Sequence, residues 1–187
     1  MRIISGKASK TKLYSLEGLN TGPTLDRVKE SLFNIIQNDI FDSIFLDLFA
    51  GSGQVGLEAL SRGARKAIFC DNSKEAIKII EKNIAKTHLE NSSKVYTMSY
   101  EKLLTTKINE KLDIIYIDPP YKSDFAYKAV EIIIKKDLID KNSIIIIETD
   151  QEEKIVEQLK NLKVEIIDKR KYGRIHLIFL KKLKIDE

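Results

Sequence analysis

Several residue types are scarce in this chain of 187 residues, and each scarcity limits what the protein can be. Cys70 is the single cysteine, so the chain can form no internal disulfide, and no cysteine-based metal cluster is expected. The two histidines, His88 and His176, lie in no motif that would pair them with a nucleophile. We therefore expect no bound metal ion, and we interpret Cys70 as a small, buried apolar residue.

Long apolar runs are also missing. The longest candidate, residues 143–147, is too short to cross a membrane, and the N-terminus lacks the pattern of a signal peptide. We expect a cytoplasmic protein with no membrane partner. With 43% hydrophobic residues the chain can bury one substantial core, and nothing in its pattern requires a second domain.

What is present is an alternation of apolar and amphipathic segments, which predicts an α/β fold around a mostly parallel sheet. Two late strands joined by the short turn at 171–173 predict a hairpin, so one edge strand should be antiparallel. A β-hairpin over residues 2–14 and a helix over residues 24–37, with Thr24 as its N-cap, come first. The predicted strands are residues 44–49, 67–71, 94–98, 113–117, 143–148, 164–168 and 174–180, and the other predicted helices are residues 54–62, 73–86, 125–135 and 152–161.

The glycine-rich turn after the first of these strands predicts a ligand site. Gly51-x-Gly53-x-x-Gly56 has the spacing of a dinucleotide-binding turn, and Asp71 lies where an acid would hold a ribose hydroxyl. This pattern is compatible with a nicotinamide oxidoreductase. Asp47, however, stands at the mouth of the turn with no neighbouring Lys or Arg, where it would repel a pyrophosphate. S-adenosylmethionine, which carries a sulfonium and no phosphate, suits these acids better, and a tight turn without a ligand is the remaining alternative.

A second motif, Asp-Pro-Pro-Tyr at residues 118–121, directly follows the predicted strand at 113–117. Prolines have no backbone N–H, so this turn presents carbonyl acceptors beside the carboxylate of Asp118 and the flat ring of Tyr121. Such a turn can hold the amino group of a planar base, and Asp118 can take the released proton. The alternative is a rigid turn without a ligand, but the position beside the glycine-rich turn favours amine binding.

Together the two motifs predict a methyl transfer at neighbouring strand ends, without a metal or a covalent intermediate. A base-amine methyltransferase is favoured. A methyltransferase acting on DNA or on a protein glutamine is the second hypothesis, although the chain lacks an insertion large enough to read a DNA sequence. A NAD-dependent oxidoreductase is the third.

Charge is distributed unevenly along the chain. Residues 1–25 carry a net charge of +3 and residues 169–187 carry +5, whereas the whole chain carries +4, so the body is acidic. Basic termini around an acidic body suit contacts with RNA phosphates at one rim and a cationic ligand inside. A solvated, lysine-rich surface is the alternative.

The residues at 1–6, 23–34, 47–53, 57–64 and 118–121 resemble the bacterial family that methylates guanine N2 in small-subunit (16S) ribosomal RNA, and the resemblance extends to Tyr172 and Gly173. It implies a Rossmann-like class I methyltransferase fold and one methyltransferase domain over residues 1–187, with residues 1–22 as a basic hairpin extension and 23–187 as the catalytic core. It also implies S-adenosylmethionine as cofactor and a monomer that binds ribosomal RNA or the assembled small subunit. The implied catalytic residues are Asp118, Pro119, Pro120 and Tyr121; the cofactor-binding residues are Thr24, Arg27, Asp47, Phe49, Gly51, Gly53, Asp71, Asn72, Ser99 and Tyr100; the RNA-binding residues are Arg2, Lys7, Lys10, Lys12 and Arg174.

The chain departs from that family pattern at several places. Gly22 stands where the family usually has Arg, and residues 8–11 replace a Gly-Arg pair, so RNA contacts there are expected to differ. Ser99 stands where an acid usually reaches the adenine amine, which leaves that contact to the backbone or to Tyr100. Asp71 replaces the usual Glu and keeps the acceptor oxygens.

Overall fold

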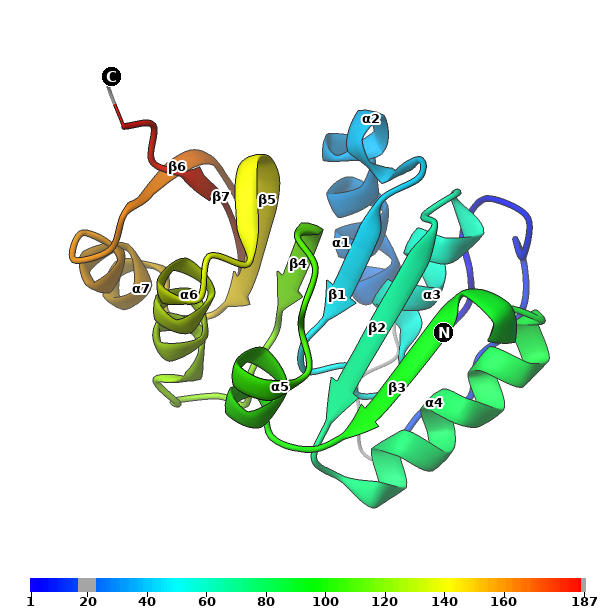
Figure 1. Cartoon of the computed structure of the whole chain (residues 1–187). Coiled ribbons are helices and arrows are strands. Elements are labelled where there is room, and N and C mark those ends of the chain that lie inside the picture. Colours follow the sequence, from blue (N-terminus) through cyan, green and yellow to red (C-terminus); the bar gives the residue numbers. More distant parts are fainter. Residues whose placement is uncertain (17–22, 186–187) are drawn as a thin grey trace.

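The computed structural model describes residues 1–16 and 23–185. A seven-stranded sheet in the order β3-β2-β1-β4-β5-β7-β6 forms its centre (Figure 1). Strands β1 to β5 are parallel, and β7 runs antiparallel to both of its neighbours, so the mostly parallel α/β sheet is confirmed. The strands are β1 Ile44–Asp47, β2 Lys66–Asp71, β3 Ser93–Thr97, β4 Leu112–Ile117, β5 Ile139–Thr149, β6 Val164–Tyr172 and β7 Ile175–Lys182.

Helices cover both faces of the sheet. Successive residues of a strand point to opposite faces, so Phe45 packs on the face covered by α1, α3 and α4, while Leu46 packs against α5, α6 and α7. Burial on both faces explains why the central strands are continuous apolar runs. The helices are α1 Pro23–Ile35, α2 Gln37–Ile40, α3 Gln54–Ser61, α4 Lys74–Thr87, α5 Tyr100–Thr106, α6 Phe125–Lys135 and α7 Glu152–Leu159, with a 3-10 turn at Glu90–Ser92. Of the helices in the described ranges, none is long and apolar enough to cross a membrane.

Three details differ from the sequence-based expectation. The antiparallel strand was expected at the edge of the sheet, but it is β7, which lies between β5 and the edge strand β6. After β5 the chain passes through α7 to form β6 at the edge, and it then turns back so that β7 pairs with both β5 and β6. Helix α5 was not expected; its seven residues are too few to produce a clear periodicity. Helix α1 begins at Pro23, so Thr24 lies within the helix and the predicted N-cap is wrong.

The N-terminal segment folds back on itself through one antiparallel bridge, between Arg2 and Lys12. The amide of Ile3 donates to the carbonyl of Thr11 at 2.9 Å, and Ile3 and Leu13 are buried in the core. In Figure 1 the segment runs beside α3 and α4, on the opposite side of the molecule from β6 and β7. The amide of Lys10 also donates to the carbonyl of Ile3 at 2.8 Å, and that of Leu13 to the carbonyl of Met1 at 3.0 Å, so the segment pairs antiparallel over a short stretch, with no longer strand within residues 1–16.

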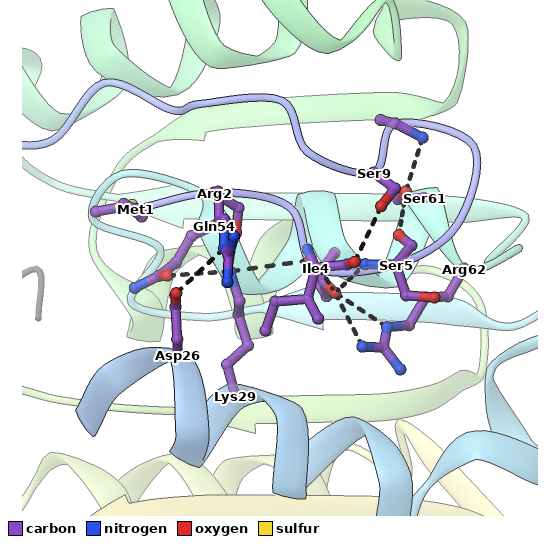
Figure 2. Close-up of polar contacts among 12 residues, drawn as sticks. Met1, Arg2, Ile4, Ser5, Ser9, Asp26, Lys29, Gln54, Ser61 and Arg62 are labelled. Carbon is purple, nitrogen blue, oxygen red and sulfur yellow. Dashed lines mark hydrogen bonds and ion pairs between the residues drawn. The ribbon is translucent and has the colours of Figure 1, made fainter. Parts of the chain in front are cut away.

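A buried carboxylate fixes this segment to the body, and we call this contact the N-terminal anchor. Glu58 on α3 is fully buried, and its Oε2 accepts from the backbone amide of Ile4 at 2.9 Å. The guanidinium of Arg62 lies 3.0 Å from Oε1, and Lys29 Nζ lies 3.8 Å from Oε2. Figure 2 shows Lys29 and Arg62 approaching the segment from two sides. The negative charge of Glu58 is therefore compensated within the protein.

Candidate active site

The register of the central strands brings acidic residues together at their carboxyl ends. Asp47 ends β1 and is paired with Tyr116 on β4. Ile117 on β4 is paired with Ile147 on β5, so Asp118, which directly follows β4, lies beside Glu148 near the end of β5. Tyr116 packs on the face covered by α1 and α3. Asp47 and Glu148 each follow, by two residues, a side chain that packs on this face, and side chains two apart in a strand point the same way. These three acidic or phenolic groups therefore face the same side of the sheet.

A cavity of about 660 Å³ opens at this point and is lined by both predicted motifs. Asp47 and Gly51 of the glycine-rich turn line it together with Asp118 and Tyr121. A second cavity of about 300 Å³ shares the 118–121 turn and Glu148 with the first and continues to Arg174. The glycine-rich turn, predicted to bind the methyl donor, and residues 118–121, predicted to bind the amine that accepts the methyl group and called the acceptor turn below, therefore meet at one site rather than in separate cavities.

The glycine-rich turn is held in shape by the two acids predicted to bind ligand. Gly51 and Gly53 have backbone φ angles of 58° and 81°, which residues other than glycine rarely adopt. Asp71 Oδ2 accepts from the amide of Gly51 at 3.0 Å, and Asp47 Oδ2 accepts from the amide of Gly56 at 3.1 Å. Each carboxylate keeps further acceptor capacity for a ligand. Gly53 does not line the cavity. It is the N-cap residue of α3, and its left-handed backbone conformation lets the turn lead into the helix.

An aromatic wall closes one side of the larger cavity. The rings of Phe49, Tyr100 and Phe125 lie with centroids 5.0 to 6.2 Å apart. Burial, with a smaller effect from Glu101, raises the pKa of Tyr100 to about 12, so its hydroxyl stays protonated at neutral pH. Among the described residues this buried hydroxyl has no hydrogen-bond partner. It can therefore donate to a bound ligand, as expected if Tyr100 replaces the acid at Ser99.

The carboxyl groups of the cavity carry an electrostatic cost. Burial, with the charges of Asp71 and Glu148 adding to it, raises the pKa of Asp47 to about 7. The pKa of Asp118 is raised by desolvation of its carboxyl and by the neighbouring Glu148, although the residue as a whole is exposed. Burial also raises the pKa of Glu148. In the part of the chain that the structure describes, no ion pair reaches Asp47, Asp118 or Glu148.

These features fit a cationic, ribose-containing ligand with a planar ring. Unpaired carboxylates suit a sulfonium and an ammonium, and the aromatic wall suits an adenine. Within residues 1–16 and 23–185 no three metal-ligating side chains form a group. Cys70 is buried, which together with nearby Asp71 and Asp47 raises the pKa of its thiol to about 12, so it is not a nucleophile.

The structure places the other predicted residues as follows. Asn72 and Ser99 line the larger cavity, whereas Arg27 is exposed and does not. The side chain of Thr24 and the position of Gly22 lie outside the described residues. Two residues that sequence reasoning missed, Glu148 and Tyr116, also line the cavity. Glu148 had a recognisable signal, because it is an acid at the end of an apolar strand, like Asp47 and Asp118. The predicted RNA-binding residues Arg2, Lys7, Lys10, Lys12 and Arg174 are all exposed.

The fold and the cavity at its strand ends define the chain as a class I methyltransferase. The Escherichia coli protein yhhF, described as a putative methyltransferase, has the same fold, with a TM-score of 0.83 and 26% identity over 98% of both chains.

Residues 1–181 match the family described as conserved hypothetical protein 95. The chain is 34% identical over 184 residues to a Bacillus subtilis protein named as the putative rRNA methyltransferase YlbH, covering 97% of this chain and 99% of that one. It is 33% identical over 158 residues to the ribosomal RNA small subunit methyltransferase D of Haemophilus influenzae, covering 83% and 82% of the two chains. The chain belongs to this family, so the resemblance found in the sequence is confirmed.

Proposed function

We propose that this protein transfers a methyl group from S-adenosylmethionine to the exocyclic N2 amine of a guanine in small-subunit ribosomal RNA. The observation that supports this most directly is the shared cavity in which Asp47 and the Asp118–Tyr121 turn lie at the ends of adjacent strands. The names of the relatives support ribosomal RNA as the substrate. The single-domain organisation and a monomeric state belong to the same proposal.

The residues of the cavity would act mainly by alignment. An Asp118 oxygen and the carbonyl of Pro119 accept the two hydrogens of the amine, which directs its lone pair toward the donor. Tyr121 is 79% exposed and offers an open face on which the base can stack. S-adenosylmethionine, when bound, supplies an electrophilic methyl whose sulfur keeps the electron pair of the broken bond and leaves as a neutral thioether. Asp118, whose oxygen accepts a hydrogen of the amine, then takes the one proton lost from N2.

The basic residues would hold the RNA beside the cavity and along the N-terminal segment. Arg174 lines the second cavity beside the acceptor turn, so it can contact a phosphate next to a base extruded toward Tyr121. The N-terminal anchor holds the backbone that carries Arg2, Lys7, Lys10 and Lys12. Exposure of all five cations is what a phosphate-binding rim requires.

A labelled-methyl assay tests the function. Wild-type protein should label small ribosomal subunits or their RNA at a guanine N2, but not DNA or a glutamine-containing protein. The variant Asp118→Ala should lose about 10²-fold to 10⁴-fold in rate while still being stabilised by S-adenosylhomocysteine. Full activity of Asp118→Ala would contradict the role of the turn. Thermal stabilisation by NAD and not by S-adenosylhomocysteine would instead support the oxidoreductase hypothesis.

A further inference from the structure

We propose that Glu148 is a specificity-determining residue: its carboxylate accepts the N1–H of the target guanine while the Asp118–Tyr121 turn holds the adjacent N2 amine. This inference rests on the proposed function and adds a residue that reads the base.

The position of Glu148 follows from the sheet. It lies near the end of β5, directly beside Asp118 at the end of β4, and both residues line the two cavities that meet at the acceptor turn. A base amine held by Asp118 and Pro119 therefore has Glu148 as its lateral neighbour. In guanine, the carbon that bears the 2-amine lies between two ring nitrogens, N1 and N3, and only N1 carries a hydrogen that Glu148 can accept.

The orientation of Glu148 is also fixed. Its Oε1 accepts from the hydroxyl of Tyr116 at 2.9 Å. A carboxylate has about four acceptor positions on its two oxygens, so Glu148 can accept a further N–H from a bound base while the bond from Tyr116 is kept.

Base chemistry then decides which ring fits. Guanine presents N1–H beside its 2-amine, so two neighbouring donors face the two neighbouring carboxyl groups. Adenine and cytosine present an unprotonated ring nitrogen beside their amine, and its lone pair would face an ionised carboxylate. With the wrong base, neither the carboxylate of Glu148 nor the ring nitrogen that faces it receives a hydrogen bond, and each acceptor left without a donor lowers the affinity.

The test compares guanine with 2-aminopurine, which keeps the 2-amine but has an unprotonated N1. After the methylated nucleotide has been mapped with wild-type protein, RNA is prepared with either base at that position. Wild-type protein should prefer guanine by about 10-fold to 100-fold in kcat/KM. In Glu148→Gln the amide can donate to the bare N1, so the preference should fall to near one or reverse. 2-Aminopurine also lacks O6, but that loss is common to both enzymes and cancels when their preferences are compared.

Three controls make the result interpretable. Glu148→Asp keeps the carboxylate and should keep the guanine preference at a lower rate. Glu153→Gln removes the same charge from an exposed position on α7 and should behave like wild type. Stabilisation by S-adenosylhomocysteine shows that each variant is folded. A wild-type preference retained by a folded Glu148→Gln overturns the inference, whereas absence of guanine N2 methylation by the wild-type protein overturns the proposed function.

Discussion

Two buried carboxylates of this protein, Glu58 and Asp47, have opposite surroundings. Glu58 in the N-terminal anchor is fully buried but accepts from backbone amides and lies beside Lys29 and Arg62. Asp47 in the cavity is only 1% exposed, and its hydrogen bond from Gly56 is accompanied by no ion pair among the described residues. The same chemical group is thus compensated in one place and left uncompensated in another.

The difference indicates which carboxylate serves the fold and which serves a ligand. Charge compensation within the protein makes Glu58 independent of any partner. Asp47 together with Asp118 and Glu148 concentrates acidic groups where nothing in the described chain neutralises them, and that arrangement costs folding free energy until a cation binds. Lys29 also lines the cavity, but its ammonium points to Glu58 and donates to the carbonyl of Arg2 at 2.6 Å.

The largest expected effect comes from breaking the anchor. Glu58→Gln removes the anion but leaves Lys29, whose side chain is 3% exposed, as a buried cation without its partner. Removing one member of a buried pair costs about 3–5 kcal/mol of unfolding free energy. Urea denaturation at pH 7 measures this. The matched control is Glu157→Gln, which removes an exposed ion pair to Lys160 and should change stability by roughly 0–1 kcal/mol. Equal stabilities of the two variants would show that the anchor does not hold the fold.

Asp47→Asn should have the opposite sign. The folded protein raises the pKa of Asp47 from 3.8 to about 7, so the carboxyl binds protons more tightly in the folded state. Ionised Asp47 therefore destabilises the protein increasingly as pH rises from about 4 to 7, by up to roughly 4 kcal/mol. The variant should be more stable than wild type at pH 8 by about 2–4 kcal/mol, with the difference disappearing near pH 4.

Ligand binding provides the second half of that test. Stabilisation by S-adenosylhomocysteine should be smaller for Asp47→Asn than for wild type, because the variant has lost an acceptor carboxylate. If Asp47→Asn is less stable than wild type at pH 8, then Asp47 is a structural acid like Glu58, and the contrast between the two regions fails.

The sequence predicted the fold in detail where local patterns carry it. Strand β4 follows from the apolar run at residues 114–117, and helix α6 follows from a 3.6-residue periodicity. The position of β7 inside the sheet depends on which edge a long connection reaches, and no local pattern encodes that. Helix α5 was missed because it is held by packing of Leu103 and Leu104 rather than by a long amphipathic pattern.

The site was predictable to a similar degree. Asp47 precedes the glycine-rich turn, and Asp118 begins the Asp-Pro-Pro-Tyr motif. Both motifs follow parallel strands, whose carboxyl ends lie at one edge of the sheet, so their meeting at one cavity could be expected. Glu148 has no motif, and its role depends on the register of β5 against β4. The N-terminal anchor depends on contacts more than 50 residues apart, such as Ser5 with Glu58, which a single sequence does not reveal.

A smaller effect should come from the backbone of the anchor. Gly6 has a φ of 88°, and a Cβ there would lie 1.9 Å from the carbonyl oxygen of Ser61. Gly6→Ala should therefore cost about 1–3 kcal/mol of unfolding free energy and weaken binding to small ribosomal subunits. The control is Gly173→Ala, where φ is 64° and no atom lies within 4 Å of the added Cβ, so the cost should be near 1 kcal/mol. If the two variants behave alike, close packing of the segment does not contribute to its anchoring.

The smallest effect tests the cavity rather than the anchor. Tyr116→Phe removes the hydroxyl that donates to Glu148 at 2.9 Å, and that hydrogen bond lowers the pKa of Glu148 against the effect of burial. Its loss should raise the pKa of Glu148, move the acidic limb of the pH–rate profile of methyl transfer to higher pH, and cost roughly 0.5–1.5 kcal/mol of stability. Tyr127→Phe removes a longer, exposed contact to Glu131, at 3.4 Å, and should leave the profile unchanged. An unchanged profile in Tyr116→Phe would mean that Glu148 does not titrate in the reaction, and the cavity carboxylates would then act by charge alone.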